Sequence, residues 1–264
     1  MTEPTVVPLE EAPDLPHRLG RHLHHDPRSR GFPFSGPAVA LVSVAWPRAV
    51  PIFDQGPVSS CTGNAAAGWL ATRTATRDGA KTWEGRAVDE PLAVDVYSQA
   101  TGIDPFDGAY PPEDTGSDGL SVVKVLQRMG VVERYEHCFD LASVLAALQL
   151  GPVLVGTAWH RDMFWPDARG LVRATGDVVG GHEYLLTEYD AAAQEVVFAN
   201  SWGPGWGQHG YGRMKTGTLM LLLDDNGDAT VPYAPVAAPP EPQPPAPAPS
   251  FWDWLLAWLR SLFG

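Results

Sequence analysis

The amino-acid sequence predicts an α+β protein in which a helical lobe and a sheet lobe meet at a cleft. Segments with helical character come first along the ordered part of the chain, and short apolar runs typical of strands follow after Gly151. Helices followed by strands, rather than alternating with them, are typical of α+β architectures. A chain of 264 residues is long enough for one large domain or for two small lobes that share a cleft.

Composition and charge narrow the class of function. Hydrophobic residues make up 44% of the chain and charged residues 19%, as in a globular protein. The formal net charge of -13 would repel a phosphate backbone, so nucleic acid is excluded as a partner. Two cysteines are too few for a disulfide framework and favour a reducing compartment. The N-terminus has acidic residues and prolines where a signal peptide would have basic residues and an apolar run, so we expect no signal peptide and a cytoplasmic protein.

Residues 1–40 are expected to form an extended N-terminal arm. They contain seven prolines and four of the eight histidines, and no apolar period of a strand or a helix. The close histidines His22, His24 and His25 could ligate a metal ion. Because no cysteine and only Asp26 lies beside them, a solvated basic segment is the favoured interpretation, and we expect no metal site and no cofactor.

The main domain is expected to span residues 41–231. Order begins near LVSVAWP, at residues 41–47. A helix is expected to begin at Cys61, because the alanine-rich sequence NAAAGWLATRTATRDG follows it and Gly79 supplies an end signal.

Two further helices and several strands complete the predicted domain. GLSVVKVLQRMG places apolar residues at helical spacing, with Ser117 or Asp118 as its cap and Gly130 at its end. Another helix fits residues 141–151. The apolar runs PVLVGTAW, EYLLTEYD and EVVFANSW are bounded by glycine, proline or aspartate and predict strands separated by turns.

The C-terminal part of the sequence has a different character. Residues 232–249 are rich in proline and are expected to form an extended, semi-rigid linker. Residues 250–264, SFWDWLLAWLRSLFG, predict an aromatic amphipathic helix that is too short to span a bilayer. Its polar face has only Asp253 and Arg260 as charges, so a membrane surface is less favoured than a protein partner, self-association or packing on its own domain.

Four residues could together perform nucleophilic catalysis by cysteine, which needs a thiolate, a base, a group that orients the base and a donor for the oxyanion. Cys61 lies at a predicted helix start, where unpaired N–H groups and the helix dipole lower the pKa of a thiol. Gln55, on a glycine-flanked turn, could direct its amide into the same site. His182 could act as the base, and Asn200 could orient its ring. Cys138 lacks such a context and is interpreted as a structural thiol.

The segments that carry these residues resemble the active-site segments of the papain family of cysteine peptidases. They are DQG followed by SSC, then GGH, then NSWGPGWGQHGYGRMKTG, in the family's order over roughly residues 41–220. The resemblance implies a papain-like two-lobed fold with an antiparallel sheet lobe and the active site in the cleft. It implies a peptidase that cleaves peptide or protein substrates through the Cys61–His182–Asn200 triad and a thioester acyl-enzyme, with Gln55 stabilising the oxyanion.

The same resemblance suggests roles for three further residues. Trp202 would shield the hydrogen bond between the histidine and the asparagine from water. Gly116 and Ser117, in TGSDG, would contact the substrate backbone, because they correspond to the family's glycine-rich stretch before its second helix.

The sequence also departs from the family pattern. Ser59 or Ser60 stands where secreted members have a disulfide cysteine, and Thr62 replaces an aromatic residue, as in intracellular bacterial and bacteriophage members. A cytoplasmic or, for a phage protein, virion-associated location follows. The first 40 residues lack the helical periodicity of the family's inhibitory propeptide, so a zymogen of that design is not expected. Thr62 and Glu183 leave an alternative open: a catalytically inactive papain-like module that binds peptide or serves in an assembly.

Overall fold

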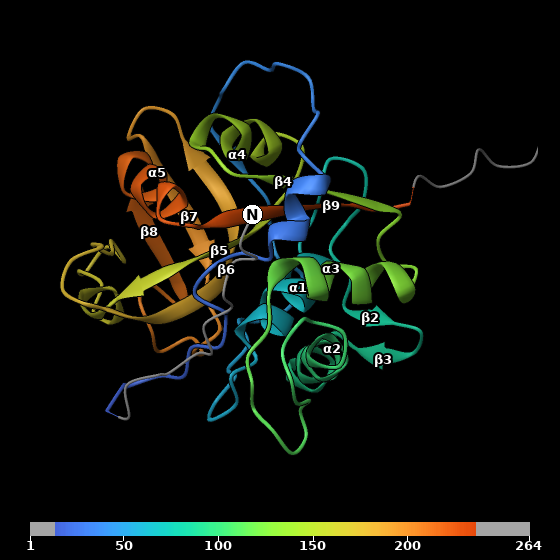
Figure 1. Cartoon of the computed structure of the whole chain (residues 1–264). Coiled ribbons are helices and arrows are strands. Elements are labelled where there is room, and N and C mark those ends of the chain that lie inside the picture. Colours follow the sequence, from blue (N-terminus) through green and yellow to red (C-terminus); the bar gives the residue numbers. More distant parts are fainter. Residues whose placement is uncertain (1–13, 236–264) are drawn as a thin grey trace, which may run out of the picture.

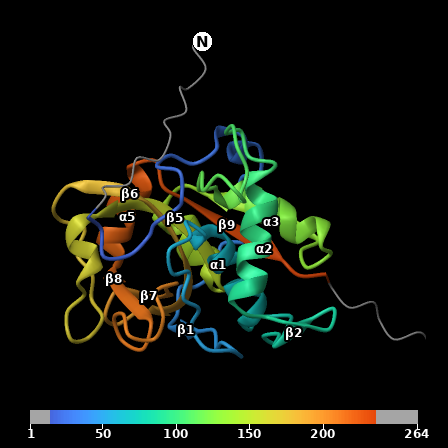
Figure 2. The ribbon, with the colours of Figure 1, turned by 90° about the horizontal axis from the view of Figure 1, so that it is seen from below.

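The computed structural model describes residues 14–235 and places helices beside an antiparallel sheet, which confirms the predicted α+β class. In both views α1, α2 and α3 gather on one side of the molecule, and α5 and most strands lie on the other (Figures 1 and 2). Residues 236–249 of the predicted proline-rich linker and the predicted helix at 250–264 lie outside the described residues. Within residues 14–235, no helix is long and apolar enough to cross a membrane.

Five α-helices occur in the described part of the chain, and a cap residue fixes the start of several. Asp118 accepts from the backbone N–H of Ser121 at 2.8 Å and begins α3, as predicted. Neither α2 nor α5 was anticipated from the sequence, although Asp89 followed by a proline in the first turn is a start signal for α2. The helices are α1 (Cys61–Ala71), α2 (Glu90–Thr101), α3 (Gly119–Arg128), α4 (Leu141–Leu148) and α5 (Thr216–Asp224).

The helix predicted from Cys61 begins at that residue but ends at Ala71, not at Gly79. The guanidinium of Arg77 donates to the carbonyls of Trp69 at 3.0 Å and Leu70 at 2.7 Å. Carbonyls in the last turn have no helical partner, so an arginine that returns to them stabilises an early end. The prediction of a longer helix was wrong for this reason.

The large sheet has seven strands in the order β4-β9-β5-β6-β7-β8, with β1 paired to β6 outside this path. Neighbouring strands are antiparallel throughout. A separate hairpin is formed by β2 and β3. The strands are β1 (Val44–Ala45), β2 (Thr82–Trp83), β3 (Arg86–Ala87), β4 (Arg134–Cys138), β5 (Val153–His160), β6 (Val178–Asp190), β7 (Glu195–Ala199), β8 (Tyr211–Lys215) and β9 (Asp228–Tyr233).

Two packing relations bring distant motifs together. α1 is buried along its whole length and packs against α2 and β6. Along the sheet, Leu185 of β6 pairs with Ala199 of β7, so Asn200, which follows β7, lies near His182 earlier in β6. The start of α1 and the first half of β6 therefore meet where the candidate residues lie.

The N-terminal arm does not behave as a solvated segment. Leu19, Arg21 and His22 are buried, and Arg21 forms isolated bridges with both Ser117 and Gly181. The arm then continues through a 3-10 helix, η1 (Pro27–Gly31). The interpretation of the histidine-rich stretch as a solvated segment was wrong, because this part of the arm packs between the two groups of elements and buries apolar and polar side chains there.

Candidate active site

Cys61 occupies the first position of α1 and is buried. Neither Cys61 nor Cys138 is in a disulfide. The Sγ atom of Cys61 accepts a hydrogen bond from the backbone N–H of Glu183 in β6 at 3.4 Å. A helix N-terminus and a backbone donor both favour a thiolate over a thiol, so this cysteine has the surroundings that a nucleophile needs.

His182 and Asn200 form a hydrogen-bonded pair. His182 Nε2 lies 2.7 Å from Asn200 Oδ1, which also accepts from the backbone N–H of Ser201 at 2.8 Å. This backbone bond assigns oxygen to the side of Asn200 that faces the ring. Nε2 must then carry the proton, which leaves Nδ1 as the basic nitrogen of His182.

Aromatic rings cover this pair. Trp202 stacks on His182 with ring centroids 4.6 Å apart and an interplanar angle of 26°, and Trp159 meets the same imidazole edge-on at 4.8 Å. Trp202 is itself buried. The stacked ring thus lies where the resemblance assigned Trp202 a shielding role.

Burial lowers the pKa of His182 to about 3. The hydrogen bond to Asn200 acts in the opposite direction, and the nearby His17 adds a further lowering effect. His182 is therefore a neutral imidazole at neutral pH in this closed arrangement. An ion pair between a thiolate and an imidazolium would require solvent to return to the site.

Gln55 directs its amide toward the arm. Its Nε2 donates to the carbonyl of Leu19 at 2.9 Å and to that of Val58 at 2.9 Å, while Oε1 accepts from Ser201 Oγ at 2.6 Å. The Ser201 bond fixes which end of the amide faces Leu19. The Leu19 carbonyl thus accepts the hydrogen bond from the Gln55 amide that was predicted to stabilise an oxyanion.

The arm is hydrogen-bonded on both sides as it passes the site. Ser117 donates its N–H to the carbonyl of Gly20 at 2.9 Å and accepts from His22 at 3.0 Å, while Arg21 donates to the carbonyl of Gly181 at 3.1 Å. Gly116 also contacts this segment, since a Cβ there would lie 2.6 Å from the Gly20 carbonyl oxygen. Both predicted substrate contacts, Gly116 and Ser117, therefore touch the arm.

The other end of the arm lies against the aromatic cover. Trp202 donates its indole N–H to the carbonyl of Arg18 at 2.9 Å. The ring of His17 stacks on Trp202 at 4.7 Å with an interplanar angle of 8°. Residues 17–22 thus run from Trp202, past Gln55, to Ser117.

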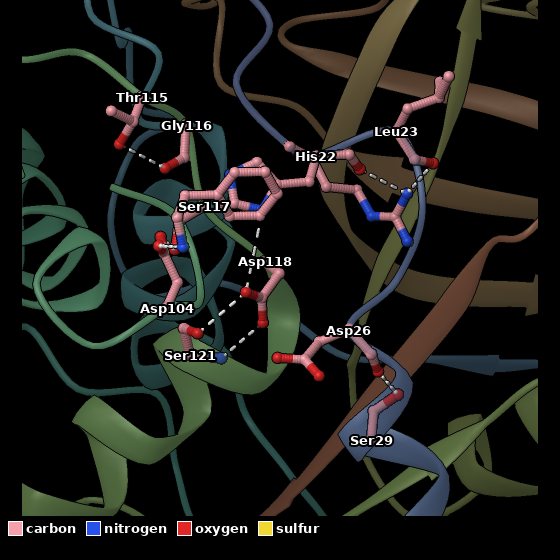
Figure 3. A network of polar contacts seen from close by, with 12 residues as sticks. His22, Leu23, Asp26, Ser29, Asp104, Thr115, Gly116, Ser117, Asp118 and Ser121 are labelled. Atoms are coloured by element: carbon pink, nitrogen blue, oxygen red, sulfur yellow. Dashed lines mark hydrogen bonds and ion pairs between the residues drawn. The ribbon is translucent and has the colours of Figure 1, made fainter. Parts of the chain in front are cut away.

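A polar network beside Ser117 was not anticipated from the sequence. His22 extends from the arm over Ser117 toward Asp118, and its Nδ1 lies 4.0 Å from Asp118 Oδ2 (Figure 3). Its ring packs on Phe106 with centroids 3.5 Å apart. Burial lowers the pKa of His22 to about 3 and raises that of Asp104, which accepts from Ser117 Oγ at 3.0 Å, to about 7.

The arm histidines do not converge. His22 is buried near Asp118, whereas His25 contacts the carbonyl of Asn226 at 3.1 Å through Nδ1. In the described range 14–235, no group of three or more histidine, cysteine, aspartate or glutamate side chains is placed to hold a metal ion.

Part of the chain is similar to known cysteine proteases. Residues 110–226 match the family model described as papain family cysteine protease. The curated relative cathepsin B-like CP2 of Giardia intestinalis is 30% identical over 98 residues, which cover 36% of this chain and 33% of that protein. The chain thus spans about a third of the length of the curated relative that it matches.

Solved structures share the fold. Xylellain, a cysteine protease from Xylella fastidiosa, gives a TM-score of 0.61 at 15% identity over 84% of this chain and 99% of its own. The digestive procathepsin L 3 of Tenebrio molitor larval midgut gives 0.52 at 18% identity over 82% and 76%. These likenesses confirm the predicted papain-like fold.

The burial of His22 predicts that acid weakens the arm's hold on the site. In the arm-bound state the pKa of His22 is about 3, and in a solvated arm it would return toward 6.5. The released state therefore binds a proton more readily, and the bound state loses stability as the pH falls from 6.5 toward 3. Replacing His22 with Phe keeps a ring against Phe106 but removes this titration. The equilibrium constant between the arm-bound and released states should then lose a pH dependence of up to about tenfold per pH unit.

The measurement is the alkylation rate of Cys61 in the full-length chain between about pH 7 and about pH 4.5. Dividing the wild-type rate by that of His22→Phe at each pH cancels the change in thiolate fraction. The ratio should rise as the pH falls. A flat ratio would show that His22 does not couple the arm to pH.

Proposed function

We propose that the chain is a papain-family peptidase that hydrolyses peptide bonds with Cys61 as its nucleophile, because residues 110–226 match that family's model and the fold is papain-like. The observation that carries this proposal is the 2.7 Å pair of His182, in β6, and Asn200, together with the next backbone N–H of β6, that of Glu183, which donates to the Cys61 sulfur. A nucleophile, a base and an orienting group are the parts that such catalysis needs.

In the proposed reaction, His182 Nδ1 takes the thiol proton and the thiolate of Cys61 attacks the scissile carbonyl carbon. The carbonyl oxygen becomes an oxyanion, which the Nε2–H of Gln55 stabilises. His182 then gives its proton to the leaving amine as the C–N bond breaks and a thioester forms. Water, deprotonated by the same ring, attacks the thioester, and release of the acid restores the thiol.

We further propose that the chain with its arm in place is the latent form of this peptidase. His182 must protonate the leaving amine, and its ring stacks on Trp202 at 4.6 Å. The leaving group therefore belongs on the Trp202 side, and the acyl part of a substrate on the Ser117 side. The arm runs the other way, with Arg18 at Trp202 and His22 at Ser117, so its Leu19–Gly20 bond would present its nitrogen on the wrong side.

Displacing the arm should activate the full-length chain. Gly20 has φ of +135°, and a Cβ there would lie 2.0 Å from the carbonyl oxygen of Ser59. Gly20→Ala therefore cannot keep the bound conformation and should raise the Cys61 alkylation rate and peptide hydrolysis by at least about tenfold. Gly31→Ala is the matched control, because a Cβ at Gly31 meets nothing within 4 Å.

If Gly20→Ala and Gly31→Ala react with alkylating agents at the wild-type rate, the arm does not restrain the site. Thermal unfolding of each variant checks that a faster reaction reflects an open site and not an unfolded domain.

Removing the nucleophile should abolish hydrolysis in the opened chain. In the Gly20→Ala background, Cys61→Ala should lower kcat/KM on a peptide substrate to the uncatalysed level, because no other group can form the acyl-enzyme. Cys138→Ala is the matched control, since burial raises the pKa of Cys138 to about 12 and leaves it unreactive. Hydrolysis that persists without Cys61 would contradict the proposed function.

A further inference from the structure

The side chain of Arg21 enters a pocket that is lined with carboxylates. It is fully buried, and so are the two acidic side chains beside it, Glu183 with 1% and Asp228 with 4% exposure. Arg21 Nη2 donates to Asp228 Oδ1 at 2.9 Å, and Nε lies 3.6 Å from Glu183 Oε2. Buried charges are tolerated only when they are paired, so this pocket suits a cation.

The walls of the pocket belong to the sheet, not to the arm. Glu183 follows His182 in β6, Asp228 begins β9, and Gly156 of β5 pairs with both of them. The carbonyl of Asn226 adds a further acceptor 3.5 Å from Arg21 Nη2. The remaining guanidinium bonds go to carbonyls of the arm itself, those of His22 at 3.0 Å and Leu23 at 2.8 Å.

Gly156 leaves the space that the guanidinium fills. A Cβ at this position would lie 2.0 Å from Arg21 Nε and 2.5 Å from Glu183 Oε2. Any side chain at 156 would therefore occupy the pocket. The volume between the two carboxylates exists because β5 has a glycine where it crosses them.

One of the groups that favour an ionised Asp228 belongs to the sheet and not to the arm. Burial tends to raise the pKa of Asp228, but the hydrogen bond with His137 and the charge of Arg21 outweigh it and lower the pKa to about 2. His137 is part of the sheet and stays when the arm leaves, 3.3 Å from Asp228 Oδ2. Burial raises the pKa of Glu183, and the charge of Asp228 adds to this effect. Asp228 thus supplies the fixed negative charge, and Glu183 supplies acceptor oxygens.

The backbone of the arm shows which substrate residue would reach this pocket. Ser117 bonds to the carbonyl before Arg21 and to the N–H after it. Leu19 presents its carbonyl to Gln55, the place assigned to the scissile carbonyl. A substrate would run in the opposite direction to the arm and bond to the same groups of Ser117. Its side chain in the pocket of Arg21 would then belong to the residue immediately before the one that carries the scissile carbonyl.

We propose that Glu183, Asp228 and Gly156 form a specificity pocket that selects peptides with arginine immediately before the residue that carries the scissile carbonyl. This inference rests on the proposed peptidase function and names its substrate class. Arginine is favoured over lysine, because one planar guanidinium reaches both sides of the pocket: Nη2 contacts Asp228 and the Asn226 carbonyl, and Nε lies beside Glu183. Glu183 departs from the family pattern at the position after the histidine. In this proposal its side chain helps to bind the arginine of the substrate.

The test uses the full-length chain carrying Gly20→Ala and Arg21→Ala, so that the arm no longer competes for the pocket. Its substrates are peptides that are identical except for arginine, citrulline, lysine or leucine at the selected position. Citrulline has nearly the shape of arginine but no charge. We expect kcat/KM to be at least about tenfold higher for arginine than for citrulline, since hydrogen bonds to charged groups are the stronger ones. Equal values would overturn the pocket.

Substitutions of the residues that line the pocket test whether they cause the preference for arginine. Asp228→Asn and Glu183→Gln should each reduce the ratio of arginine to citrulline, and Gly156→Ala should lower cleavage of the arginine peptide more than that of one with alanine at the selected position. Glu188→Gln is the matched control, because this half-buried glutamate lies in the same strand outside the pocket. An unchanged ratio in the folded Glu183→Gln and Asp228→Asn chains would assign the preference to another part of the protein.

A second readout separates this inference from the proposed function. The same peptides are added at increasing concentration while iodoacetamide alkylates Cys61, and the modified cysteine is followed by mass spectrometry. Half-protection should require at least about tenfold less arginine peptide than citrulline peptide. If no peptide is cleaved but arginine peptides still protect selectively, the peptidase proposal fails and the pocket stands as a binding site. If arginine and citrulline peptides protect Cys61 equally, the proposed arginine selectivity is wrong, whether or not the peptides are cleaved.

Discussion

Backbone hydrogen bonds on both sides of residues 20–22 hold this segment between Ser117, next to α3, and Gly181 of β6. Much else at the site depends on this constraint. It carries the Leu19 carbonyl to the amide of Gln55 and fixes which side chain enters the pocket at Asp228. In the proposed peptidase, the arm closes the site with the contacts that a substrate backbone would use, but in the opposite direction.

The same constraint accounts for the electrostatics of the candidate triad. Burial of His182 lowers its pKa to about 3, so the closed site holds a neutral imidazole near the thiol. If the arm leaves, water returns, and the pKa should rise toward the range in which an imidazole exchanges protons near neutral pH. The proposed latency therefore has two parts: a blocked path for the substrate and a base that is not yet solvated. Both end together when residues 17–22 depart.

The correct sequence-based predictions of the fold came mostly from local patterns. A helix start at Cys61, a cap at Asp118 and strands after Gly151 depend on neighbours in the chain, and the structure contains all three. The arm could not be predicted in this way, because its partners are distant: Arg21 and Asp228 are separated by 207 positions. Its prolines and histidines also indicate a solvated segment when they are judged by composition. The available signal was Glu183, an acidic residue beside a buried histidine, which implies a cation nearby.

The most direct measurement is the amide hydrogen exchange of Gly20, Arg21 and His22 in the full-length chain before and after alkylation of Cys61. These N–H groups bond to the carbonyls of Gly181 and Ser117, whereas that of Ser29 bonds to Asp26 within the arm and serves as the control. We expect slow exchange at 20–22 in the untreated protein and rapid exchange once a group on Cys61 excludes the arm, with Ser29 unchanged. Protection of residues 20–22 that persists after complete alkylation of Cys61 would show that the arm does not occupy the site at Cys61.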